Sequence, residues 1–167
     1  MAMKYLEQIK NKIVLADDLR AIMDKEQAAG RKFAFSNGCF DLVHQGHIDY
    51  LSKSRDLADY LIIGLNSDAS VRRLKGPRRP INDEYSRALM LASFVFVDYV
   101  VLFADDTPYN LIKTLQPDIL IKGSDYKVED IVGYDIVTAR GGKVATLDFV
   151  PGFSTSLIEQ RILQEKE

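Results

Sequence analysis

The chain has 167 residues, a length that favours one domain with a single hydrophobic core. Hydrophobic residues make up 47% of it and charged residues 28%, a usual mixture for a globular protein. The net charge of −2 argues against a dedicated nucleic-acid binder, so we expect no nucleic-acid partner.

The composition also bears on the compartment. A single cysteine, Cys39, excludes a disulfide within the chain. Residues 1–14 are too polar for the apolar segment of a signal peptide, and no apolar run approaches the roughly 20 residues needed to span a bilayer. These features predict a cytoplasmic protein with no membrane association.

The first half of the chain alternates between helical and strand patterns. A helix is expected over 17–29, with Asp17 as its N-cap and Gly30 as its stop. It is followed by a strand at 32–36, a helix at 46–57, a buried-type strand at 60–65 and a short helix at 67–74.

The second half continues the alternation after a loop, 75–82, that is rich in Arg, Lys, Pro and Gly. Asp83 should cap a helix that runs to about Phe96. Thr107 followed by Pro108 is a favourable start for a later helix. The remaining expected elements are strands at 99–103, 119–121 and 144–147, a loop at 123–127, a helix ending near Gly141 and Gly142, and a last helix from its cap Ser154 through Leu163.

This alternation predicts an α/β fold with one five-stranded parallel sheet and helices on both of its faces. Ligands of such sheets bind at the carboxyl ends of the strands. We expect residues 1–30 to form an N-terminal helical extension and residues 31–167 to form the functional domain.

The chain has only two histidines, His44 and His47, with Gly46 between them at an expected helix start. Unpaired backbone N–H groups and the helix dipole attract phosphate there, and Gly46 lets the backbone approach a ligand. Two ordinary surface histidines at a helix cap would give the same pattern. A zinc site is the third alternative, but no further histidine could complete it, and we assign no metal ligand.

The string from Asn37 to His47, NGCFDLVHQGH, resembles the HxGH signature of the cytidylyltransferase-like nucleotidyltransferases. The resemblance implies a Rossmann-like fold in which His44 and His47 hold a triphosphate. It places the nucleotide against Gly46 and the first loop, comprising Asn37, Gly38, Cys39 and Phe40. Asp41 either holds that loop or contacts the second substrate, and we assign it to the substrate side.

Two further segments match phosphate-binding parts of that superfamily. Lys75, in the loop at 75–82, occupies the position of a lysine that neutralises phosphate charge. Arg79 in that loop is assigned to the substrate. Arg87, in the next helix, occupies the position of an arginine that contacts phosphates. The alternatives are a solvated charged turn and a helix-surface arginine.

The segment GFSTS resembles the superfamily's final motif and places Ser154, Thr155 and Ser156 against the nucleotide; a plain helix cap by Ser154 is the alternative. Two positions depart from the pattern. Phe149-Val150-Pro151 stands where relatives carry an arginine, and Cys39 stands where many have threonine.

Beyond the superfamily, NSDAS, RPIN and KGSDY resemble the adenylyltransferase domain of the bacterial heptose-phosphate enzymes that make ADP-heptose. We assign Gly123 and Asp125 to the nucleotide and Tyr126 to the substrate; an Asx turn with a packed aromatic is the alternative. In two-domain relatives this unit is fused to a sugar kinase, so we expect a stand-alone form that acts after a separate kinase.

The resemblance implies that D-glycero-D-manno-heptose 1-phosphate attacks the α-phosphorus of ATP, with Mg²⁺ as cofactor, and that the protein is a homodimer. Two rivals remain open. One is another transferase of the same fold, such as a glycerol-3-phosphate cytidylyltransferase that uses CTP. The other is a nucleotide-binding module without catalytic activity.

Overall fold

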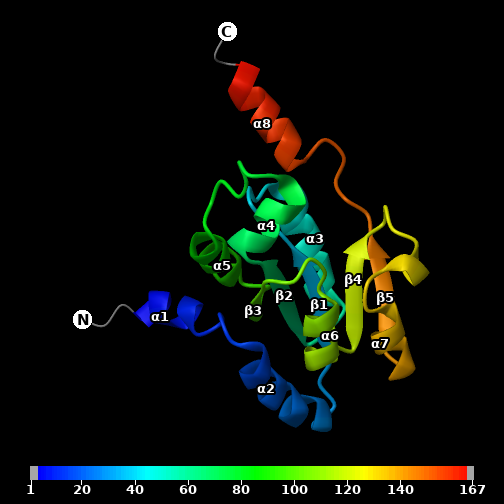
Figure 1. The fold of residues 1–167 in the computed structure, drawn as a ribbon. Coiled ribbons are helices and arrows are strands. Elements are labelled where there is room, and N and C mark those ends of the chain that lie inside the picture. The colour runs from blue at the N-terminus through cyan, green and yellow to red at the C-terminus, as the bar shows by residue number, and fades with distance from the viewer. Residues whose placement is uncertain (1–3, 165–167) are drawn as a thin grey trace.

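The computed structural model describes residues 4–164 (Figure 1). The outermost parts of the expected segments 1–30 and 31–167, and of the polar start 1–14, therefore lie outside the described residues. The described part contains a five-stranded sheet with the strand order β3-β2-β1-β4-β5, in which all pairings are parallel. Its strands are β1 (Phe33–Gly38), β2 (Tyr60–Asn66), β3 (Tyr99–Phe103), β4 (Ile119–Gly123) and β5 (Lys143–Leu147). The predicted fold class is confirmed.

The helices cover both faces of the sheet. They are α1 (Lys4–Lys10), α2 (Ala16–Ala28), α3 (Gln45–Asp56), α4 (Asp68–Lys75), α5 (Glu84–Ala92), α6 (Tyr109–Leu115), α7 (Tyr134–Ala139) and α8 (Thr155–Gln164), with a 3₁₀ turn at Val128–Asp130. On one face, buried residues of α2, α6 and α7 pack against strand residues such as Phe35 and Leu120. On the other, buried residues of α3 and α5 pack against residues such as Ala34 and Ile121. Alternate strand residues thus supply two hydrophobic cores.

Three expected boundaries were wrong. Asp17 does not cap α2: the N-cap is Leu15, without a side-chain cap, and Asp17 lies in the first turn, where its charge suits the helix dipole. The helix capped by Asp83 ends at Ala92 instead of Phe96. Pro108 is the N-cap of α6 rather than a residue of its first turn. The helix α1 was not anticipated.

The segment before β1 packs closely on the sheet. Leu19 and Met23 of α2 are completely buried in the first core. Ile13 forms a parallel bridge with Val100 of β3, and the Val14 amide donates to the Val100 carbonyl at 3.0 Å. This contact covers part of an edge strand that would otherwise expose its backbone groups. The expected boundary between an N-terminal extension, 1–30, and the functional domain, 31–167, stays a prediction.

The strand order fixes where a ligand can bind. The chain moves outward from β1 through β2 to β3 and then returns to the other side of β1 to form β4 and β5. Loops that leave β1 and β4 therefore diverge at the carboxyl edge, where such sheets have a crevice. Figure 1 shows α8 projecting from the body on this side of the sheet. No helix within residues 4–164 combines the length and the apolar character needed to cross a membrane.

Gly64 in β2, an interior strand of the sheet, tests the packing of the first core. A Cβ atom there would lie 2.7 Å from Cζ of Phe35 and 3.2 Å from Cδ2 of Leu111. We expect Gly64→Ala to lower the free energy of unfolding by about 1–3 kcal/mol, because the buried ring must shift. Urea unfolding would measure this, with Ser124→Ala on an exposed loop as the control. An unchanged midpoint for Gly64→Ala would contradict the packing described.

Candidate active site

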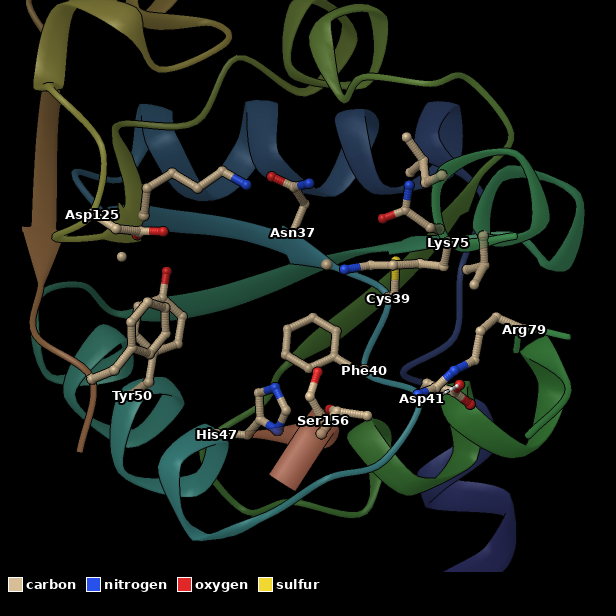
Figure 2. Close-up of a pocket in the computed structure, with 18 of the residues that line it drawn as sticks. Asn37, Cys39, Phe40, Asp41, His47, Tyr50, Lys75, Arg79, Asp125 and Ser156 are labelled. Atoms are coloured by element: carbon tan, nitrogen blue, oxygen red, sulfur yellow. Dashed lines mark hydrogen bonds and ion pairs between the residues drawn. The ribbon is translucent and has the colours of Figure 1, made fainter. Parts of the chain in front are cut away.

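A cavity of about 710 Å³ opens at the carboxyl edge of the sheet (Figure 2). This volume lies in the range of small-molecule sites. Its wall is built from the loop after β1, α3, α4 and the loop that follows it, the end of β4, and the start of α8. The lining residues used below are Asn37, Gly38, Cys39, Phe40, Asp41, His47, Tyr50, Lys75, Arg78, Arg79, Asp106, Lys122, Gly123, Asp125, Tyr126, Phe149, Thr155, Ser156 and Glu159.

The loop after β1 turns sharply at Phe40, whose φ of 45° lies in the left-handed region. The Phe40 ring is buried and folds back over Gly38, where a Cβ atom would lie 3.0 Å from the ring. The ring also packs against His47, with 5.3 Å between ring centroids. Gly38 and Phe40 therefore shape the cavity floor on which the first loop and α3 meet.

Arg87 of α5 holds the loops behind this floor. Its side chain is completely buried, and Nη1 donates to the carbonyl oxygens of Cys39 at 2.7 Å and Asn66 at 2.8 Å. Nε donates to the Asn82 carbonyl, and Nη2 pairs with the Asp68 carboxylate at 2.8 Å. Arg87 does not line the cavity; it joins the loops that leave β1 and β2, and its contact with the nucleotide stays a prediction.

Asp41 plays a similar part on the other side of the loop. Its carboxylate accepts hydrogen bonds from the backbone amides of Ile81 and Asn82 at 2.8 and 2.9 Å, and from Nη1 of Arg79 at 2.8 Å. Burial opposes its ionisation, but these hydrogen bonds outweigh that cost and hold the pKa of Asp41 below its usual value. Both oxygens therefore fix the loop at 79–82, which agrees with the first of the two roles considered for Asp41. Asp41 also lines the cavity, and its contact with the substrate stays a prediction.

Arg79 is likewise committed to carboxylates. It joins Asp41 to Glu159 of α8, and its side chain is mostly buried although it lines the cavity. The pair ties the last helix to the body of the domain. The guanidinium of Arg79 already binds two carboxylates. Its assignment to the substrate remains a prediction.

The two imidazoles lie together at the start of α3. Their ring centroids are 3.9 Å apart with an angle of 30° between the planes. Nδ1 of His47 accepts a hydrogen bond from the His44 backbone N–H at 3.4 Å, which assigns the ring proton of His47 to Nε2. His47 lines the cavity, whereas His44 lies behind it and also stacks near Phe153.

Burial keeps both imidazoles neutral. Desolvation, assisted by the neighbouring His44, lowers the pKa of His47 to about 4, and desolvation lowers the pKa of His44 as well. A neutral His47 with its proton on Nε2 is a hydrogen-bond donor at neutral pH. Gly46 makes room for this arrangement, because a Cβ atom there would lie 3.1 Å from the His44 ring.

The charged residues of the cavity wall are not all paired. Asp41, Arg79 and Glu159 pair with one another, and Asp106 pairs with Arg73. Within residues 4–164, no ion pair joins Lys75, Arg78, Lys122 or Asp125 to a partner. Three free cations face Asp125 and the one carboxylate charge that Arg79 leaves unbalanced, so positive charge is in excess by one and favours an anion.

The start of α8 contributes hydroxyl groups. Ser154 caps the helix, accepting a hydrogen bond from the Leu157 amide at 3.1 Å, and does not line the cavity. Thr155 and Ser156 do, and Figure 2 shows Ser156 on the same side of the cavity as His47. Ser154 therefore serves as the helix cap, the alternative considered for it, and its contact with the nucleotide stays a prediction.

The end of β4 forms the opposite wall. Gly123 lies directly against the Phe149 ring, which a Cβ atom would overlap. Asp125 and Tyr126 follow it and line the cavity, and their assignments to the nucleotide and the substrate stay predictions. Tyr50 of α3 faces this region, and its hydroxyl bonds with that of Ser36 at 2.9 Å. Burial raises the pKa of Tyr50 to about 12.

The cavity is also lined by Lys122, Tyr50, Phe149 and Glu159, none of which the sequence analysis assigned to the site, although Lys122 begins the KGSDY string and Phe149 was noted as a departure from the family pattern. One signal was available for Lys122: a lysine near the end of an otherwise apolar strand is unusual. Tyr50 and Glu159 follow ordinary helical spacing, and Phe149 lies in a loop, so no local pattern distinguishes them.

The described residues include no group of three or more His, Cys, Asp or Glu side chains placed to hold a metal ion. Asp125 is the cavity carboxylate without an ion-pair partner, and a single carboxylate is a weak cation site. A divalent cation would therefore have to bring most of its ligands with it, as it does when bound to a polyphosphate.

Fold and cavity together define an α/β protein with an anion-attracting site at the carboxyl edge of its sheet. The sequence model of the cytidylyltransferase-like family matches residues 35–161. The chain belongs to this family.

Within this family, the chain is similar to proteins named HldE. The chain is 52% identical over 157 residues to the bifunctional protein HldE of Syntrophotalea carbinolica, a match that covers 94% of this chain and 32% of that protein. It is 59% identical over 136 residues to the bifunctional protein HldE of Campylobacter jejuni, with 81% and 29% covered. The chain spans about a third of the length of these relatives.

Solved structures agree on the fold. A lipopolysaccharide core biosynthesis protein from Thermoplasma volcanium aligns with a TM-score of 0.60 and 27% identity, covering 72% of this chain and 98% of that one. Pantothenate synthetase from Thermus thermophilus aligns with a TM-score of 0.54 and 17% identity, covering 83% and 62%. The second likeness concerns the fold alone.

Arg87→Met should lower the free energy of unfolding by about 3–5 kcal/mol, because Asp68 would be left as an uncompensated, partly buried charge and three carbonyl oxygens would lose their donor. Urea unfolding measures the change. Arg72→Met, an exposed arginine of α4, is the matched control and should stay within about 0.5 kcal/mol of the wild type. A loss below 1 kcal/mol for Arg87→Met would show that the loops do not depend on it.

Stability should fall as the pH is lowered from 6.5 to 4. The unfolded chain binds a proton at His47 below a pKa of about 6.5, whereas the folded chain does so only below about 4. The loss attributable to His47 is at most about 3 kcal/mol, since a pKa difference of one corresponds to about 1.4 kcal/mol. Denaturant unfolding at several pH values measures it. His47→Asn, whose amide oxygen can still accept from the His44 N–H, should flatten the slope; an equal slope in the variant would refute a neutral His47.

Proposed function

We propose that the protein is an adenylyltransferase that joins D-glycero-D-manno-heptose 1-phosphate to ATP and releases ADP-heptose and pyrophosphate. The observation that supports this most is that a neutral His47, unpaired lysines and the start of α8 line the same cavity. The high identity to proteins named HldE supports the heptose substrate, and the family supports nucleotidyl transfer.

The reaction would proceed by direct in-line displacement. A phosphate oxygen of the sugar phosphate forms a bond to the α-phosphorus of ATP, and the bond between that phosphorus and the bridging oxygen breaks. The electron pair leaves with pyrophosphate. A phosphate monoester is already anionic at neutral pH, so the chain's main tasks are to align the two anions and to stabilise the leaving charge.

The named residues suit these tasks. In the proposed complex, His47 donates from Nε2, and Lys75 supplies a charge from α4 across the cavity. Thr155 and Ser156 supply hydroxyl and backbone donors at the start of α8. Cys39 is not needed as a nucleophile: burial, although opposed by nearby cations, raises the pKa of its thiol, which disfavours the thiolate.

The proposal also includes a cofactor, an oligomeric state, a location and a source of the sugar phosphate. ATP would enter as its magnesium complex, with Mg²⁺ held chiefly by phosphate oxygens. A homodimer, a cytoplasmic location and a sugar kinase activity that supplies the phosphorylated heptose complete the expectation drawn from the heptose-phosphate family. The cavity opens directly to solvent, so a diffusing sugar phosphate could reach it.

His47→Ala tests the proposed function. We expect kcat/KM for pyrophosphate release from ATP and heptose 1-phosphate to fall about a hundredfold, because one preorganised donor to the developing charge is worth about 3 kcal/mol. Lys113→Ala, an exposed lysine of α6 remote from the cavity wall, should leave turnover unchanged. Undiminished turnover in His47→Ala would remove the proposed site.

A rival transferase of the same fold would use CTP with a polyol phosphate. Comparing ATP with CTP, each paired with heptose 1-phosphate and with glycerol 3-phosphate, separates the two activities in one pyrophosphate assay. The proposal requires turnover with ATP and the heptose phosphate; turnover with CTP and glycerol 3-phosphate instead would overturn it. ATP binding without any turnover would indicate a non-catalytic module.

A further inference from the structure

Lys122 is a charged residue of the cavity wall that has no role in the reaction as proposed above. It lies in β4 between Ile121 and Gly123, both of which are buried, and its own side chain is partly buried. Among residues 4–164, no hydrogen bond or ion pair engages its ammonium group, in contrast to Lys12, which donates to two carbonyl oxygens. An ammonium group that is withdrawn from water and left without a partner is costly unless a ligand compensates it.

Asn37 lies next to Lys122. The parallel register pairs Phe35 of β1 with Leu120 of β4, so continuing it by two residues brings Asn37 beside Lys122 on the same face of the sheet. Both residues line the cavity. Oδ1 of Asn37 is buried and has no hydrogen-bond donor, which makes it the second polar group here that lacks a partner.

This corner is separate from the groups proposed to hold the triphosphate. The family resemblance places Asn37 against the nucleotide, and its unpartnered Oδ1 is the reason for assigning it to the second substrate instead. Figure 2 shows Asn37 on the opposite side of β1 from His47 and Ser156. A triphosphate held by α3 and the start of α8 would leave the corner of β1 and β4 for another ligand. That ligand must bring an anion for Lys122 and a hydroxyl donor for Asn37, and a sugar phosphate carries both.

We propose that Lys122 and Asn37 form the subsite for the sugar phosphate, in which Lys122 binds the attacking phosphate and Oδ1 of Asn37 accepts a hydrogen bond from a sugar hydroxyl. The inference deepens the proposed function and depends on it for the identity of the sugar. It makes Lys122 the residue that distinguishes a phosphorylated acceptor from a neutral sugar.

The subsite should respond to pH through Lys122. Desolvation lowers its pKa to about 8, and the groups that oppose this are Asp125 in the loop after β4 and Cys39 after β1. The cavity also presents Lys75 from α4 and His47 and Tyr50 from α3, while its β5 neighbour is the uncharged Thr146. Above pH 8 the free enzyme loses the charge, so kcat/KM for the sugar phosphate should fall about tenfold per pH unit.

Three variants test the assignment in the pyrophosphate assay. Lys122→Met should raise KM for heptose 1-phosphate about 10- to 100-fold, the range expected for a lost charged hydrogen bond, and change KM for ATP less than threefold. Lys122→Arg should restore most of the affinity and abolish the fall above pH 8, because arginine stays charged. Lys113→Met on α6 should match the wild type throughout.

The opposite results would overturn the subsite. These are an unchanged KM for the sugar phosphate in Lys122→Met, a larger effect on ATP than on the sugar phosphate, or a wild-type profile that is flat from pH 7 to 9. Should the wild type release no pyrophosphate with heptose 1-phosphate, the proposed function fails, and a thermal shift with mannose 1-phosphate decides the subsite separately. A rise in Tm that Lys122→Met abolishes supports it, and no rise, or an equal rise in both proteins, refutes it.

Discussion

The buried guanidinium of Arg87 is the interaction on which the site depends. Parallel strands end with carbonyl groups that the sheet no longer satisfies, and the chain must turn away from β1 and β2 within a few residues. Arg87 meets this need from inside the protein, since it donates to the carbonyl groups of Cys39, Asn66 and Asn82. Asp41 complements it by accepting from the amides of the neighbouring loop. Two charged residues thus fix the wall, which leaves the exposed face of the cavity free for ligand-binding groups.

The separation between charged residues that fix the wall and residues that are free to bind a ligand explains the electrostatic character of the cavity. Arg79 is shared by Asp41 and Glu159, so these three residues keep one net negative charge within the wall, and the histidines are kept neutral by burial. What remains for a ligand is a hydrogen-bond donor at His47 and the unpaired cations Lys75, Arg78 and Lys122. A neutral imidazole costs less to bury than an imidazolium, and it still donates to a phosphate oxygen. The free protein therefore needs no counter-ion at its histidine pair while it retains an attraction for polyphosphates.

Much of this could be predicted from the sequence, because the relevant signals are local. Apolar runs bounded by Gly and Asp marked all five strands, and the caps Asp83 and Ser154 follow from side-chain chemistry. The HxGH string identified the family, which the match over residues 35–161 confirms. The roles of Arg87, Asp41 and Lys122 could not be predicted in this way. Their partners lie in other loops, and only the strand order β3-β2-β1-β4-β5 brings those loops together. A charged residue near a phosphate motif looks the same in sequence whether it faces the ligand or supports the wall.

The central claim is that the cavity recognises a chain of phosphates through His47, Lys75 and the start of α8. Isothermal titration calorimetry of the wild-type protein with AMP, ADP and ATP in magnesium buffer tests it directly. The account predicts that affinity rises with each added phosphate and that ATP binds at least a hundredfold more tightly than AMP, because each charge-assisted contact is worth about 1.5–3 kcal/mol. Equal affinity for AMP and ATP would contradict it, since recognition would then come from the nucleoside alone.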